Sequence, residues 1–135
     1  MEHAMKKVVL LFVAPLLFVA SQVRAEGAYA VAIPEGGLRD GFAYGLSTNY
    51  RTREEAEQGA IAECRKQAIR FDVPESRCKV IETFQKQCLS IAFDRKDRWV
   101  GWAIAASREQ AAADAIKKCS EGAKNCATSN TDCDR

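Results

Sequence analysis

Two segments, Thr52-Arg53-Glu54-Glu55-Ala56 and Ser107-Arg108-Glu109-Gln110-Ala111, decide the fold that we predict for this chain. In each, Thr or Ser is followed three residues later by Glu or Gln, which is the pattern of a helix capping box. Both boxes lead into Ala-Ile and then a cysteine, Cys64 or Cys119, at a constant offset of 55 residues. The pattern predicts two copies of one unit, with helices near 53–69 and 108–119.

The predicted helices carry small residues on the side expected to face a sheet. These are Ala56, Gly59, Ala60 and Ala68 in the first helix, and Ala111, Ala112 and Ala115 in the second. Small side chains let a helix lie close against a sheet. We expect Ile61, Ile69 and Ile116 to add bulk to the contact.

Two strand-like runs precede each helix: residues 29–33 and 41–46 in the first copy, 89–93 and 99–105 in the second. Residues 41–45 match residues 99–103 in the two copies. Turn-forming or charged residues separate the runs of each pair. A further run at 78–84 links the copies. We therefore expect an α+β fold, an antiparallel sheet of about five strands with two helices packed on it.

The first 25 residues have the pattern of a secretory signal peptide. Lys6 and Lys7 precede an apolar run over 8–20, and Val23 and Ala25 are small residues where a signal peptidase reads the chain. The apolar run of 13 residues is shorter than the ~20 that span a bilayer. We expect cleavage after Ala25 and no stable membrane anchor afterwards.

The expected mature protein is a single domain over residues 26–135, made of repeats 26–86 and 87–135. Its 17 basic and 17 acidic residues cancel, although the full chain has 20 and 18. A neutral domain has no basic field for phosphates, so we expect no nucleic-acid partner. The one histidine, His3, lies in the signal. Without histidine the domain cannot build a Ser-His or Cys-His site, and we expect no cofactor, no metal and no enzyme activity.

All six cysteines lie in the mature part: Cys64, Cys78, Cys88, Cys119, Cys126 and Cys133. An even number in a short exported domain indicates a disulfide framework. Six residues separate the closest cysteines, too many for the close pairs of zinc sites. Because Cys64 and Cys119 occupy the same place in two similar helices, the repeat favours Cys64–Cys78 and Cys119–Cys126. This leaves Cys88–Cys133 as the third pair.

Several short motifs follow one another along the mature part, and most have a counterpart in the second copy. They are Ala30-Val31-Ala32, Gly41 to Gly45, Ala56 to Cys64 and Cys78-Lys79-Val80, then Ser90 to Ala92, Gly101-Trp102-Ala103 and Ala112 to Cys119. Together they resemble the bacterial family called domain of unknown function 4189. The resemblance covers essentially the whole mature chain and implies a small exported bacterial protein. It implies no catalytic residue, and Ala105-Ala106 stands where the family commonly has a Gly-Pro or similar turn.

Carboxylates are the catalytic option left to a domain without histidine. Glu54, Glu55 and Glu57 lie in the first helical turn, where acids complement the helix dipole and complete the cap. Asp94 and Asp97 bracket a charged hairpin tip and are typical of a solvated turn. A secreted effector or small carboxylate-dependent hydrolase would need a pair such as Asp94 and Glu109 within about 10 Å.

A binding surface is the preferred hypothesis. Arg95, Lys96 and Arg98 on an exposed hairpin could enter an acidic cleft of a partner. Trp99 and Trp102 lie on opposite faces of one strand, so we expect one of them to be partly exposed. Tyr44 and Tyr50 are further candidates, because exposed aromatic side chains are favoured anchors of binding surfaces.

The partner that we expect is another protein. The domain would act in the periplasm or outside the cell, for example as an inhibitor or immunity-type protein against a toxin or hydrolase. Function is expected where the two copies differ, at the tips 34–40 and 94–98 and in the segment 48–51.

Overall fold

Six strands and two helices make up residues 24–135, the part of the chain that the computed structural model describes. Most of the predicted signal peptide, residues 1–25, lies outside the described residues. The elements are β1 Glu26–Ala32, β2 Ala43–Tyr50, α1 Arg53–Arg70, β3 Lys79–Phe84, β4 Cys88–Asp94, β5 Trp99–Ala105, α2 Arg108–Cys119 and β6 Ala127–Cys133. Short 3-10 turns lie at Leu38–Asp40 and Glu75–Arg77.

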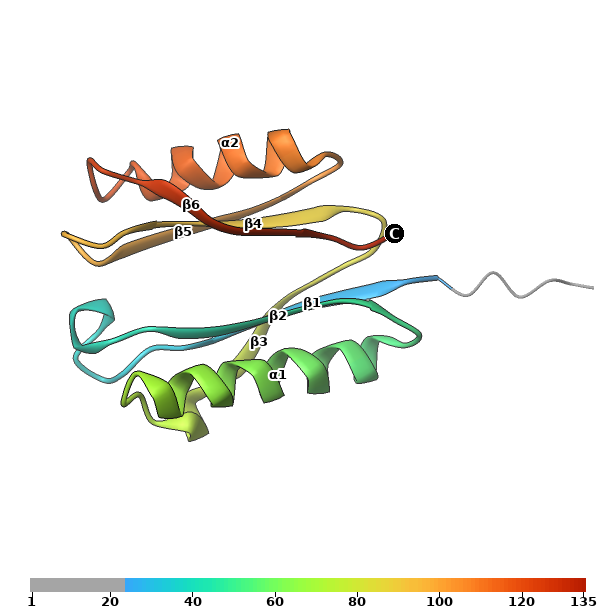
Figure 1. Cartoon of the computed structure of the whole chain (residues 1–135), viewed down its shortest axis with the longest axis horizontal. Coiled ribbons are helices and arrows are strands. Elements are labelled where there is room, and N and C mark those ends of the chain that lie inside the picture. Colours follow the sequence, from blue (N-terminus) through green and yellow to red (C-terminus); the bar gives the residue numbers. More distant parts are fainter. Residues whose placement is uncertain (1–23) are drawn as a thin grey trace, which may run out of the picture.

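The strands form two three-stranded antiparallel sheets, ordered β2-β1-β3 and β5-β4-β6. In both sheets the strand that follows the helix pairs with the central strand on the side away from the hairpin. Helix α1 covers the outer face of one sheet and α2 that of the other, which gives four layers, helix-sheet-sheet-helix (Figure 1). The α+β prediction is confirmed, but the expectation of about five strands in one sheet is wrong.

The central strand β1 explains why the molecule has a second sheet. All its residues are buried. Ala28, Ala30 and Ala32 pack with α1, whereas Tyr29 and Val31 pack with residues of the second sheet. A strand that is apolar on both faces needs a layer on each side. The second sheet provides the layer opposite α1.

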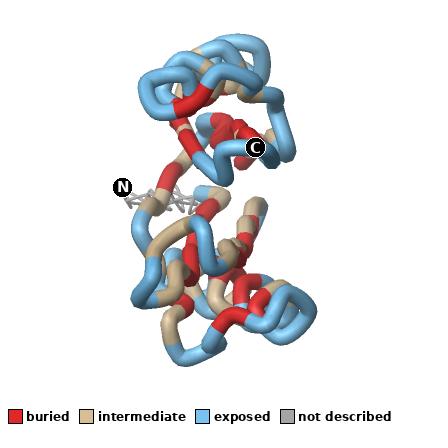
Figure 2. The backbone as a smooth tube through the Cα atoms, turned by 90° about the vertical axis from the view of Figure 1, so that its left-hand side faces the viewer, coloured by how far each residue is buried: buried red, intermediate tan, exposed pale blue. Residues whose placement is uncertain are grey.

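Side-chain size differs between the layers. Large residues from both sheets, among them Tyr29, Phe84, Leu89 and Ile91, form the layer between the sheets. The layers under the helices consist largely of alanine and cystine. Figure 2 shows the buried residues in the interior of each half and the exposed residues around the helices. Each half therefore has a thin helix–sheet layer, and the two halves share the bulky one.

Two glycines set the distance between helix and sheet. A Cβ atom on Gly45 would lie 1.9 Å from the Ala60 carbonyl oxygen and 2.4 Å from the Cys64 nitrogen. On Gly101 it would lie 2.8 Å from the Ala115 oxygen and 2.3 Å from the Cys119 nitrogen. Gly101 is thus the counterpart of Gly45. The match of residues 41–45 with 99–103, which pairs Gly45 with Ala103, is therefore out of register by two residues.

Thr52 and Ser107 cap the helices as predicted. The hydroxyl of Thr52 accepts the Glu55 N–H at 3.1 Å, and that of Ser107 accepts the Gln110 N–H at 3.1 Å. Helix α2 has the predicted bounds, and α1 runs one residue further than expected. Ile69 does not add bulk to the core, because it is 69% exposed near the end of α1.

Three disulfides join Cys64 to Cys78, Cys119 to Cys126 and Cys88 to Cys133. These are the three pairs that the sequence predicts. The first two tie each helix to the segment after it. The third joins directly opposite positions of β4 and β6.

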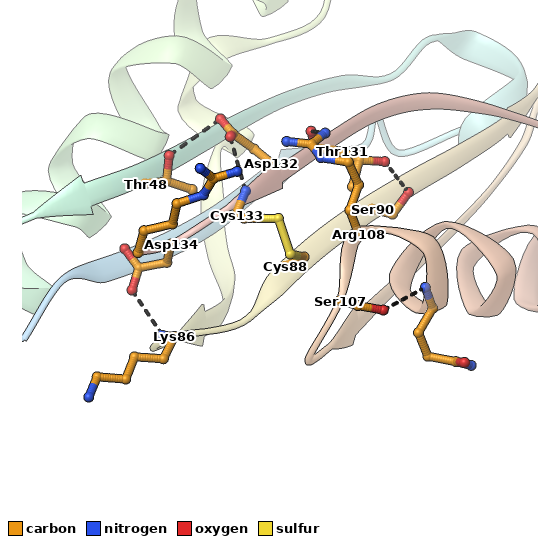
Figure 3. The surroundings of a disulfide bond; sticks show 12 residues. Thr48, Lys86, Cys88, Ser90, Ser107, Arg108, Thr131, Asp132, Cys133 and Asp134 are labelled. Carbon is orange, nitrogen blue, oxygen red and sulfur yellow. Dashed lines mark hydrogen bonds between the residues drawn. A yellow bond between two sulfur atoms is a disulfide. The ribbon is translucent and has the colours of Figure 1, made fainter.

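The C-terminal segment, expected only as a tail, is the edge strand β6 and contacts both halves of the molecule (Figure 3). The Asp134 carboxylate accepts the backbone N–H of Asn49 at 2.9 Å and that of Lys86 at 3.1 Å. The Thr48 hydroxyl donates to Asp132 at 3.3 Å. The end of the chain therefore links β2 of the first sheet to the start of the second half.

Candidate functional site

The two predicted hairpin tips, 34–40 and 94–98, lie together at one end of the molecule. The Arg98 guanidinium donates a hydrogen bond to the Arg39 carbonyl oxygen, and both tips lie at the left in Figure 1. The third expected segment, 48–51, lies at the other end of β2. The tip end therefore brings together two of the three segments where function was expected.

Asp94 anchors this end of the molecule. Its Oδ1 accepts the N–H groups of Lys96 at 2.8 Å and Asp97 at 3.0 Å, and its Oδ2 accepts that of Asn125 at 2.8 Å. Its side chain is fully buried, so the expectation that Asp94 belongs to a solvated turn is wrong. The hydrogen bonds from the Asp97 and Asn125 amides hold the pKa of Asp94 below its usual range.

The lowered pKa of Asp94 predicts a pH-dependent contribution to stability. A carboxylate with a lowered folded pKa stabilises the fold above its unfolded pKa of about 3.9 and loses this as pH falls through the folded pKa. Asp94→Asn should therefore lower the urea midpoint at pH 7, and the gap to the wild type should shrink towards pH 2. Asp97→Asn is the control, because Asp97 supplies only its backbone N–H. A gap that stays constant with pH would contradict the assignment.

A groove of about 540 Å³ opens between the two sheets at the tip end. We call it the inter-sheet groove. Its apolar lining comes from both halves of the molecule: Leu38, Phe42, Tyr44, Phe71, Ile91 and Phe93. Its polar lining includes Arg95, Arg98, Asp40 and Gln67. The Gln67 side-chain oxygen accepts the Tyr44 N–H of edge strand β2 at 3.4 Å.

A second hollow of about 790 Å³ lies on the outside of the tips. We call it the outer tip surface; it comprises Gly36, Leu38, Arg39, Lys96, Asp97, Arg98, Trp99 and Gly122. Trp99 is 42% exposed. Its indole lies on Gly122, where an added Cβ would come within 2.1 Å of the ring. The backbone of Gly122 thus supports an aromatic surface that faces solvent.

The tip end carries cations without carboxylate partners. Over residues 24–135 the ion pairs within 4.0 Å are Lys66–Glu63 and Arg77–Glu35. The basic side chains of the tips, Arg39, Arg95, Lys96 and Arg98, are all exposed and belong to neither pair. Three exposed acids, Glu35, Asp40 and Asp97, belong to the tip segments, and Glu35 is paired with Arg77. The tips therefore expose four cations that make no ion pair within the described residues.

The other predicted binding residues lie elsewhere. Trp102 packs in the layer between the sheets, 5.7 Å from the Tyr29 ring, and its indole N–H donates to Glu82 at 3.4 Å. Tyr44 is half-buried and lines the inter-sheet groove. Tyr50 lies against Gly59 at the far end of β2 and does not join the tip surface. Three lining residues were not among the predicted ones: Phe42 and Phe71 in the inter-sheet groove, and Arg39 on the outer tip surface.

The carboxylates of the hydrolase hypothesis do not meet. Asp94 pairs with Trp99 at the tip end of β4, whereas Cys88 pairs with Ala105 at the other end, shortly before Glu109. At about 3.3 Å per residue, the six steps of β4 separate these ends by roughly 20 Å, twice the separation that glycosidase chemistry uses. Among residues 24–135, no group of three or more His, Cys, Asp or Glu could hold a metal ion.

No helix in the described part of the chain is long and apolar enough to cross a membrane.

Comparison with known proteins bears on family and fold. A family model described as "Domain of unknown function (DUF4189)" matches residues 27–133. The NMR structure of Rv1813c from Mycobacterium tuberculosis is similar, with a TM-score of 0.53 and 21% sequence identity over 99% of this chain and 94% of that one. At this identity the likeness concerns the fold alone. No curated protein matches the chain significantly.

Proposed function

The chain belongs to the family described as "Domain of unknown function (DUF4189)", and we propose that it is an exported binding protein that holds a protein partner on its outer tip surface. The observation that carries this proposal is the exposed Trp99 beside cations that have no carboxylate partner. Tryptophan and arginine are enriched among residues that dominate binding energy. An unpaired basic patch also attracts an acidic partner.

Export is part of the proposal. Three disulfides close the described domain, and disulfides persist in oxidising compartments such as the periplasm or the extracellular space. The pattern of residues 1–25 agrees with passage to those compartments. The disulfides would keep the tips in one arrangement, so that little conformational entropy is lost on binding. An inhibitor or immunity-type protein uses such a rigid surface.

The proposal predicts that Trp99→Ala and Lys96→Glu each weaken partner binding at least tenfold, because both remove groups from the centre of the outer tip surface. Partners would be cross-linked in the exported protein fraction of the producing cell, purified, and titrated by calorimetry at two salt concentrations. Binding should weaken at the higher salt concentration, since the contact includes charged groups.

Two variants provide matched controls. Tyr50→Ala removes an aromatic of similar exposure, 39% against 42%, from the other end of the molecule. Lys117→Glu reverses an exposed charge on α2. Both should bind as the wild type does. A purified partner that loses affinity equally with all four variants, or with none, would contradict the tip surface as the binding site.

The carboxylate-dependent hydrolase remains the alternative, and no geometry described above favours it, since Asp94 uses its oxygens to accept backbone N–H groups.

A further inference from the structure

We infer that the inter-sheet groove is a binding site for a linear amphiphile with one carboxylate head, a fatty acid. This site adjoins the outer tip surface, with which it shares Leu38 and Arg98, but it does not depend on the proposed protein partner. Its volume of about 540 Å³ falls within the roughly 300–1,000 Å³ of small-molecule sites. The lining combines a continuous apolar part with few polar groups, which is the usual composition of such sites.

The apolar part of the groove is made of rings that the two sheets leave partly uncovered. Phe42, just before β2, stacks on Phe93 of β4 with ring centroids 6.2 Å apart and an interplanar angle of 12°. Phe42, Tyr44 and Phe93 are only half-buried, although they belong to the layer between the sheets. Phe71, at the end of α1, extends this surface and is 53% exposed. An alkyl chain lying along these rings would remove apolar surface from water.

The charged groups of the groove favour an anionic head. Arg95 and Arg98 line it, and neither belongs to an ion pair within the described residues. Asp40 also lines it, but its carboxylate lies against Gly36, where an added Cβ would be 1.5 Å from Oδ2. The lining therefore has one net positive charge. A guanidinium binds a carboxylate through two parallel hydrogen bonds, so a carboxylate head at this rim is chemically matched.

The edge of β2 beside the groove argues for an alkyl chain over an added peptide strand. Its Tyr44 N–H is already bonded to the Gln67 side chain. An incoming strand would need this N–H for main-chain pairing. An alkyl chain needs no backbone partner.

The test uses dansyl-labelled undecanoic acid as the fluorescent probe and unlabelled compounds as competitors, all below their aggregation concentrations. Dodecanoic acid should displace the probe with 1:1 stoichiometry. Each methylene added from octanoic to dodecanoic acid should tighten binding up to about fourfold. Methyl dodecanoate, which has the chain but no charge, should bind about tenfold more weakly.

Variants locate the site. Arg95→Gln should weaken dodecanoic acid about tenfold and leave the methyl ester unchanged, whereas Phe71→Ser should weaken both equally. Arg65→Gln, on the exposed side of α1, is the matched control and should change neither. The outer-tip variants Lys96→Glu and Trp99→Ala should also leave dodecanoic acid binding intact, which separates this site from the proposed partner site.

The inference is overturned if the acid and its methyl ester compete equally, or if Arg95→Gln weakens both to the same extent. It is also overturned if the protein binds vesicles of anionic phospholipid but no free acid, because the tip end would then be a membrane-surface site. Displacement that appears only above the aggregation concentration of the competitor would count against it in the same way.

Discussion

Replacing Gly45 with alanine should separate α1 from its sheet and cost at least about 3 kcal/mol of folding free energy. The added methyl would stand 1.9 Å from the Ala60 carbonyl oxygen and 2.4 Å from the Cys64 nitrogen. Both are backbone atoms of a disulfide-tied helix, so neither can rotate away as a flexible side chain would. Gly101→Ala should behave in the same way, because Cys119 and Ala115 crowd it from α2. Urea unfolding followed by near-ultraviolet circular dichroism measures the loss.

Gly59→Ala is the informative control for this prediction. It adds the same methyl group inside α1, where the nearest atom is the Tyr50 side-chain oxygen at 2.7 Å. A terminal ring can move, and alanine is favoured over glycine in a helix by about 1 kcal/mol. Gly59→Ala should therefore be neutral or stabilising. If Gly45→Ala were equally well tolerated, Gly45 would not be required for the close contact between helix and sheet.

The helices and disulfides could be predicted from the sequence because their determinants are local. A capping box lies within four residues, and Cys64 and Cys119 stand at the same distance from their capping boxes. The sheet arrangement could not, because it depends on both faces of β1. In the printed sequence, Ala28-Tyr29-Ala30-Val31-Ala32 alternates small and large apolar residues. This alternation of residue size, without alternation of polarity, indicates a strand that is buried between two layers.

Strand β6 was missed for a related reason. Its residues Ala127–Cys133 are mostly polar and exposed, so no apolar pattern marks it. Its pairing with β4 ends at Cys133, directly opposite Cys88. The predicted Cys88–Cys133 bond already placed one residue of the tail next to β4, and this was the signal that could have suggested a sixth strand.

The candidate site was predicted in part. The tip cations and Trp99 follow from the rule that an exposed hairpin between matched strands is free to carry function. The inter-sheet groove depends on residues that are distant in sequence, such as Phe71 after α1 and Phe93 in β4. These residues meet because the two sheets pack face to face. A charged turn is usually solvated, yet Asp94 is buried where three backbone N–H groups need an acceptor.

Removing the Cys88–Cys133 bond should destabilise the domain more than removing either other disulfide. Its sequence separation is 45 residues, against 14 for Cys64–Cys78 and 7 for Cys119–Cys126. The loop-entropy model gives about 4 kcal/mol for the longest loop and about 2.5 kcal/mol for the shortest. The double variant Cys88→Ala/Cys133→Ala leaves no unpaired thiol. Its unfolding in urea is compared with that of Cys119→Ala/Cys126→Ala.

The loss should extend beyond chain entropy, because this bond also holds the segment that joins the two halves. Asp132 and Asp134 flank Cys133 and bond to Thr48, Asn49 and Lys86. A released β6 would weaken these contacts between the first sheet and the second half. Hydrogen exchange should therefore rise at Asn49 and along β6 in the Cys88/Cys133 variant, while the Cys119/Cys126 variant should show increased exchange near the end of α2. Equal destabilisation by the two variants, with exchange at Asn49 unchanged, would show that the tail does not join the halves.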